Sequence, residues 1–183
     1  MNHNMWIRGA ALITSVLVAA CATPPAQIDT VSSRTSRYDR PLKRVVVVVG
    51  GLGVLDSRVV RSQLSDELKA NQVRALVLQH DPLLMPEPVL ANQDAVRALR
   101  PQAFLQLQVL RWSNSLQRNV QAHFGASLSL AGGRSVWEAR FVMNGTEQGE
   151  SILVAQLMKK LIDDRIIDKD APEPDDTPAA RRI

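Results

Sequence analysis

Cys21 is the residue whose chemistry is best defined by its surroundings. It is the only cysteine in the chain and directly follows two alanines. Upstream lies an apolar core, Gly9–Val18, preceded by a single charged side chain, Arg8. That core is too short to cross a bilayer, which takes ~20 apolar helical residues. The pattern predicts a secretory signal peptide over residues 1–20 that is removed just before the thiol.

The segment Leu17-Val18-Ala19-Ala20-Cys21 resembles the lipobox of bacterial lipoproteins. The resemblance implies that the Cys21 thiol receives a diacylglycerol, that signal peptidase II cuts after Ala20, and that the new amino terminus is acylated, for example with palmitate. The covalent lipid on Cys21 is then the membrane anchor. Residue 22 is Ala rather than Asp, which in such proteins favours the outer membrane, with the domain in the periplasm. The alternative is a cleaved signal peptide followed by an incidental cysteine.

Residues 21–183, 163 in number, suffice for one domain with a hydrophobic core. The full chain is 45% hydrophobic and 22% charged, an ordinary globular composition, with a formal net charge of +4. With its cysteine lipidated, the mature protein has no disulfide and no cysteine metal site. Five basic residues between Arg34 and Arg44 could touch anionic headgroups close to the anchor. Only one aromatic residue, Tyr38, lies among them, and the expected periplasmic location is wrong for nucleic acid, so we expect no nucleic-acid binding.

Two other groups of residues could support chemistry. His80-Asp81 could be half of a metal site or a base with its orienting acid, and His123 is the other histidine of the mature chain. Nothing in the spacing unites these residues, so we expect no metal and no catalysis. Gly50–Gly53 follows a valine-rich strand, but the dinucleotide fingerprint would need a small residue where Asp56 stands. We interpret this loop as a tight turn and expect no cofactor.

Hydrophobic periodicity predicts the order strand–helix–strand–helix–strand–strand–strand–helix. The strands are expected at Val45–Val49, Val73–Gln79, Ala103–Ser113, Val120–Leu130 and Ser135–Asn144, and the main helices at Arg58–Ala70 and Glu150–Asp168. The first two strands flank a helix and should be parallel, whereas the last three should form an antiparallel meander. The sequence therefore predicts a single α/β (α+β) domain with a mixed five-stranded sheet and helices packed against it.

Polar stretches flank this predicted domain, which spans residues 43–168. Residues 21–42 have no apolar period and are expected to form a flexible tether, whose part Ala22–Arg40 would reach roughly 60 Å when extended. Residues 169–183 are acidic and proline-containing, and a disordered tail is expected there. His80–Gln93 contains three prolines and is expected to be an irregular loop before a short helix.

Two tryptophans of the predicted domain invite different interpretations. Trp137 begins a strand and is expected to pack under the last helix. Trp112 lies where the third predicted strand ends, next to Arg111. Tryptophan and arginine are common at the centres of protein interfaces, so Trp112 and Arg111 are the candidate partner-binding residues. The alternative for Trp112 is a place in the core.

The valine run Val45–Val49, the strand Phe104–Trp112 and the hairpin Ser127–Trp137, behind a lipobox, are similar to parts of small α/β envelope lipoproteins. That class includes CsgG, PelC and LpoB. The resemblance implies a non-catalytic outer-membrane lipoprotein whose periplasmic domain binds or scaffolds an envelope protein complex, and a homo-oligomer is among the partners it allows. Auxiliary lipoproteins of envelope transport systems share the meander-then-helix ending and are one alternative. A periplasmic enzyme or small-ligand-binding protein is the other, which a pocket lined by His80, Asp81 and His123 would favour.

Overall fold

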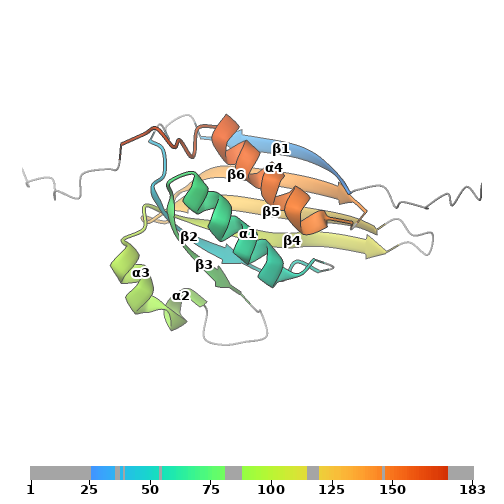
Figure 1. The fold of residues 1–183 in the computed structure, drawn as a ribbon, viewed down its shortest axis with the longest axis horizontal. Coiled ribbons are helices and arrows are strands. Elements are labelled where there is room, and N and C mark those ends of the chain that lie inside the picture. Colours follow the sequence, from blue (N-terminus) through green and yellow to red (C-terminus); the bar gives the residue numbers. More distant parts are fainter. Residues whose placement is uncertain are drawn as a thin grey trace, which may run out of the picture.

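The computed structural model describes residues 26–35, 38, 40–53, 55–80, 88–114, 120–145 and 147–172. This part of the chain forms one mixed sheet of six strands in the order β1-β6-β5-β4-β2-β3 (Figure 1). The strands are β1 (Gln27–Arg34), β2 (Arg44–Val49), β3 (Arg74–Gln79), β4 (Ala103–Asn114), β5 (Val120–Leu130) and β6 (Ser135–Asn144), and the helices are α1 (Ser57–Ala70), α2 (Pro88–Ala91), α3 (Gln93–Leu99) and α4 (Gly149–Asp163). The expected single α/β domain with a mixed sheet is confirmed.

The valine run forms β2, which lies in the middle of the parallel part of the sheet. It pairs in parallel with β3 on one side and with β4 on the other. A strand covered on both faces favours continuous β-branched residues, because neither face needs polar side chains. Helix α1 returns the chain between β2 and β3. The Asp56 carboxylate caps the start of α1 by accepting a hydrogen bond from the backbone N–H of Arg58 at 2.8 Å. Val60 and Leu64 of α1 are buried.

Strands β4, β5 and β6 form the predicted antiparallel meander. Alternate residues of β5, such as Ala122 and Phe124, face the core, and Leu157 of α4 is fully buried there. Helices α1 and α4 lie side by side over this one face of the sheet (Figure 1). The sequence of the last helix repeats apolar residues along one side, which predicts a stripe packed on the sheet. Ile162 belongs to that stripe by spacing but is 44% exposed. The stripe is therefore slightly narrower than the sequence pattern suggests.

The sixth strand comes from the segment that was expected to be a flexible tether. Gln27–Arg34 forms β1, which pairs antiparallel with β6 along its full length. The Ser32 hydroxyl donates to Asp164 Oδ2 at 2.7 Å, just beyond α4, and Tyr38 and Leu42 are buried as well. The tether prediction for residues 21–42 is therefore wrong from residue 26 onward, because strand pairing and a polar side-chain contact hold a segment that has little apolar character.

The second face of the sheet is only partly covered. Helices α2 and α3 pack on β2 and β3, and Pro88–Ala91 is helical where an irregular loop was expected. The Asn92 side-chain amide donates to the Pro88 carbonyl at 2.8 Å instead of capping α3. Over β4, β5, β6 and β1, no described helix covers this face. We call this area the bare face; its outward side chains include Asp29, Val31, Leu110, Arg111, His123, Glu138, Arg140 and Val142.

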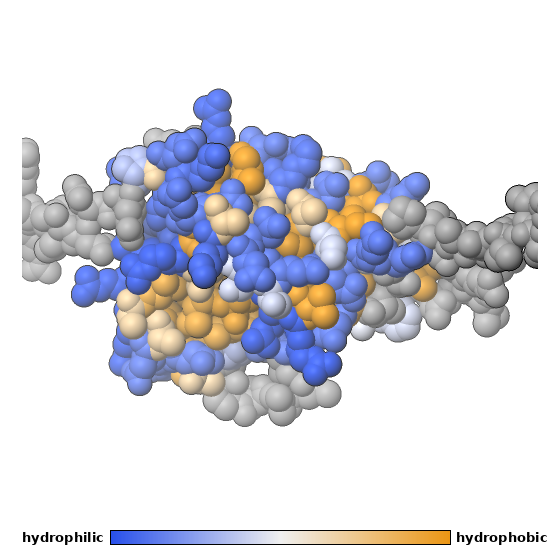
Figure 2. All heavy atoms as spheres, in the orientation of Figure 1, coloured by the Kyte–Doolittle hydropathy of each residue, from blue (hydrophilic) through white to orange (hydrophobic). Residues whose placement is uncertain are grey.

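The opposite, helix-covered side is mostly hydrophilic at its surface, as Figure 2 shows. Apolar atoms gather there between α1 and α3, over the edge strand β3, whose Ala75, Leu76 and Val77 are half-buried (Figure 2). Within the described residues, no helix is both long and apolar enough to span a membrane. The features that bear on function are therefore the bare face and the two ends of the sheet.

Candidate binding surface

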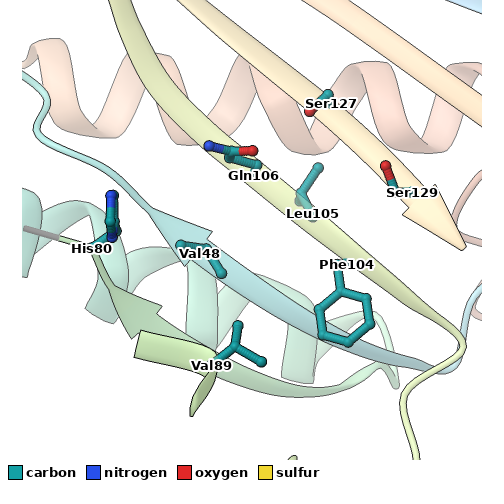
Figure 3. A pocket seen from close by; sticks show the side chains of 8 residues that line it. All are labelled: Val48, His80, Val89, Phe104, Leu105, Gln106, Ser127 and Ser129. Atoms are coloured by element: carbon teal, nitrogen blue, oxygen red, sulfur yellow. The ribbon is translucent and has the colours of Figure 1, made fainter. Parts of the chain in front are cut away.

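The residues considered for metal or acid–base chemistry do not come together. His80 follows β3 and lines a cleft of about 360 Å³, together with Val89 of α2 and Phe104 of β4. In Figure 3 His80 and Phe104 lie on opposite sides of this cleft, and Ser127 and Ser129 of β5 line it as well. His123 lines a different hollow. Asp81 lies outside the described residues, as does Cys21.

Among the described side chains that line the cleft beside His80, none is a carboxylate. The buried Nδ1 of His80 has no hydrogen-bond partner among the described residues. Nor does that part of the chain contain a group of three or more His, Cys, Asp or Glu residues able to hold a metal ion. Of the pocket that would favour an enzyme or a small-ligand binder, the two described members, His80 and His123, line separate hollows.

The glycine loop after β2 is a tight strand-to-helix turn. The Gly50 N–H donates to the Leu107 carbonyl at 2.7 Å, which continues the pairing of β2 with β4. Gly53 has φ +65°, a left-handed conformation that glycine adopts without steric cost. The glycines therefore serve the abrupt change of direction between β2 and α1, as the turn interpretation predicts.

Arg111 and Trp112 lie on opposite sides of the sheet. Arg111 is level with His123 and lines the same hollow on the bare face. Trp112 is level with the buried Ala122, on the helix side, and a side chain at Gly53 would stand 3.6 Å from its Cδ1 atom. Trp112 is 50% exposed, so it is not a core residue. The two candidate residues therefore cannot serve one flat interface together.

An irregularity in β4 determines this arrangement. The register passes from Val109 opposite Phe124 to Arg111 opposite His123, which leaves Leu110 as an extra residue. Such a bulge re-aims the side chains that follow it. Leu110 lies across Gly125 of β5, where an added side chain would meet it at 3.0 Å. Leu110 and Arg111 therefore both lie on the outward face of β4, side by side.

The main hollow of the bare face has a volume of about 470 Å³ and lies around this leucine. Its floor is apolar, and Val31 and Leu110 are 75% and 51% exposed. Arg140 lies across the sheet between Leu110 and Val31, Arg111 follows Leu110, and Asp29 is the single acid among the described lining residues. The surface combines apolar area with two guanidinium groups, which suits an apolar side chain flanked by carboxylates. Val31 was missed in the sequence because β1 was not predicted, and Leu110 and Arg140 were not singled out although strand alternation places them on this face.

A polar cluster on the helix side ties β1 to the rest of the domain. Asp164 Oδ2 accepts hydrogen bonds from Trp137 Nε1 and from the Ser32 hydroxyl, both at 2.7 Å. Partial burial works to raise the pKa of Asp164, but these two hydrogen bonds and the nearby Lys160 and Arg34 outweigh it and lower the pKa. Trp137 itself is 1% exposed, so its predicted position beneath the last helix is confirmed.

The fold and these surfaces define a single α/β domain with one bare sheet face. No protein-family model matches the chain, and no curated protein matches it. Among solved structures, the PelC dodecamer from Paraburkholderia phytofirmans aligns with a TM-score of 0.47 and 16% identity, over 74% of this chain and 95% of that one. A PDZ domain protein from Parabacteroides distasonis aligns with a TM-score of 0.41 and 8% identity, over 75% of this chain and 36% of that one. These are loose similarities of fold and assign no family.

Proposed function

We propose that this protein is a non-catalytic lipoprotein, anchored in the outer membrane through Cys21, whose domain binds an envelope protein complex through its bare face. The lipobox supports the location. The observation that carries the binding role is the hollow around Leu110, where the exposed apolar side chains of Leu110 and Val31 lie on either side of Arg140, with Arg111 next to Leu110. Isolated exposed apolar residues are ordinary, but a cluster with flanking arginines is typical of an interface.

The expected partner is a protein that presents an apolar side chain flanked by carboxylates. Val31 and Leu110 would cover its apolar group, and the guanidinium groups of Arg111 and Arg140 would pair with its acids. Side chains of β1, β5 and β4 line the hollow together, so the partner would contact the edge strand and the meander at once.

Crosslinking in the native envelope tests this role. A photo-crosslinking residue placed at Val31 should capture one defined protein, and the same residue at Val59, an exposed valine on α1, should not. Leu110→Asp should abolish the capture at Val31, because a carboxylate would replace the apolar floor and repel the partner's acids. Its melting temperature should stay near wild type, because exposed substitutions usually change stability by less than about 0.5 kcal/mol. Equal capture at Val31 and Val59 would contradict the proposed surface.

The anchoring has its own test. Thioether formation requires sulfur, so Cys21→Ser should remove the lipid mass from the mature protein and release the domain from membranes. A wild-type mature protein without acyl chains would contradict the lipoprotein assignment. His80→Ala serves as the control for the small-ligand alternative, and we expect it to leave capture at Val31 unchanged.

A further inference from the structure

The connection between the lipid and the folded domain is short. Ala26 is already buried, and its N–H donates to the Glu147 carbonyl at 3.1 Å. Only residues 22–25 separate it from Cys21. Five residue steps reach at most roughly 17 Å when fully extended, at about 3.4 Å per step. If Cys21 carries the lipid, as the proposed function holds, Ala26 lies within that distance of the membrane surface.

The point at which the chain enters the domain selects one end of the sheet. Ala26 also lies against Gly145, where an added side chain would meet its Cα at 3.5 Å. Strand β1 starts at this end, β6 and β4 finish there, and both α1 and α4 begin there (Figure 1). We call it the anchor end, defined by Ala26, Gly53, Trp112, Gly145 and Glu147. A connection this short keeps the anchor end toward the bilayer.

Trp112 is the large apolar side chain at the edge of the anchor end. Across the sheet it is level with Ala122, then Met143, then Ile28, which is two residues after the point of entry. Its indole is half exposed beside Gly53 in the turn before α1. Tryptophan is enriched at the boundary between membrane and water, because its ring is apolar and its N–H is polar.

The charges of the described residues at this end do not favour anionic lipid. The exposed Arg58 and Arg111 are offset by the exposed Asp56 and Glu147 and by the half-buried Glu150. Of the basic residues that were considered for headgroup contact, Arg34 and Arg44 lie at the other end of the sheet. Arg34 ends β1 and Arg44 begins β2, roughly 25 Å from the anchor end for a strand of this length. A contact at the anchor end would therefore be apolar and insensitive to salt.

We propose that the anchor end rests on the lipid bilayer with the Trp112 indole in the interfacial region, so that the domain makes a second, non-covalent contact with the membrane. The lipid holds this end at the surface, and the short connection raises the effective concentration of Trp112 there, which makes even a weak contact persistent. The bare face then stands upright beside the membrane, open to a partner that approaches from the side.

Fluorescence of the mature, lipidated protein tests the contact. Removal of the signal peptide takes Trp6 away and leaves Trp112 and the buried Trp137 as the only tryptophans. The protein is reconstituted in phosphatidylethanolamine–phosphatidylglycerol vesicles with lipids brominated near the headgroup end of their acyl chains. We expect bromine to quench a large share of wild-type emission and almost none of the emission of Trp112→Phe, with no change at high salt.

Each outcome is decisive. Wild-type emission that is the same with and without bromine, on vesicles that retain the lipidated protein, overturns the contact. If Trp112→Phe is quenched as strongly as wild type, Trp112 is not the residue in contact with the bilayer. If quenching of the wild type is lost at high salt, the contact is electrostatic and not apolar. Mass spectrometry of the same sample keeps the two proposals separate: absence of acyl chains contradicts the lipid anchor itself, whereas an acylated protein with unquenched Trp112 contradicts only the docking of the anchor end.

Discussion

The helix-covered face and the bare face of the sheet are built from alternate residues of the same strands. On β5, Ala122 and Phe124 point toward α1 and α4 and are fully buried, whereas Gln121 and His123 point the other way. The first set stabilises the domain by removing apolar surface from water. The second set contributes little to stability and is free to vary with what the surface binds. Substitutions on the helix side should therefore change stability, and those on the bare face should change binding.

The largest effect is expected from Leu157→Asp on the helix-covered face. Leu157 is fully buried in α4, and the substitution would place a carboxylate without a partner in the core. The cost should be several kcal/mol, comparable to the whole stability of a domain of this size. Thermal or urea unfolding measures it. Leu110→Asp makes the same change on the bare face and should leave the unfolding midpoint near wild type; similar losses in both variants would remove the distinction between the faces.

The two tryptophans give a milder version of the same contrast. Trp137→Phe removes the donor of a 2.7 Å hydrogen bond to Asp164 in a buried setting, and it should lower the free energy of unfolding by about 2 kcal/mol. Trp112→Phe changes a half-exposed ring and should cost less than about 0.5 kcal/mol. Urea unfolding of the two variants measures the difference. A loss for Trp112→Phe as large as that for Trp137→Phe would place Trp112 in the core.

The smallest expected effect is on how the stability of the domain changes at acidic pH. The pKa of Asp164 is lowered in the folded protein, so its charged form adds stability above the unfolded pKa of about 3.9. That contribution should disappear as the pH falls through the lower, folded pKa. Asp164→Asn should therefore show a flatter loss of stability below about pH 4 than wild type, measured as the urea midpoint against pH. The control is Asp66→Asn, which changes an exposed carboxylate. If the urea midpoint falls with pH in the same way in wild type and in both variants, Asp164 does not make the proposed contribution to stability.

The parts of the fold predicted correctly are those with strong hydrophobic periodicity. The five valines of β2, the alternation along β5 and the stripe on α4 each correspond to large buried areas, and the sequence shows them directly. Strand β1 was missed because two of its three half-buried inward residues, Thr30 and Ser32, are polar. Its stability depends on pairing with β6 and on Asp164, which is over a hundred residues away, and no local pattern reports such a contact.

The candidate surface was only partly predictable. Strand geometry alone places adjacent residues on opposite faces, so the separation of Arg111 from Trp112 could have been foreseen. The bulge at Leu110 could not, because it depends on how β4 and β5 pair. Without it, Arg111 would point toward the helices. The three β-branched residues Ile28, Thr30 and Val31 were the available hint of a strand before the valine run, and with it of the exposed valine.

The full-length pairing of β1 with β6 also determines how the domain resists mechanical pulling. If the partner holds the bare face while the lipid moves with the membrane, tension enters at Gln27, the first residue of β1, and acts along the strand. The backbone hydrogen bonds of an antiparallel pair run across the strands, so this pull loads all of them in shear at once instead of opening them one by one. The contacts of Ser32 and Arg34 with Asp164 brace the far end of the same strand. The strand that continues into the anchor is thus well placed to transmit force without leaving the sheet.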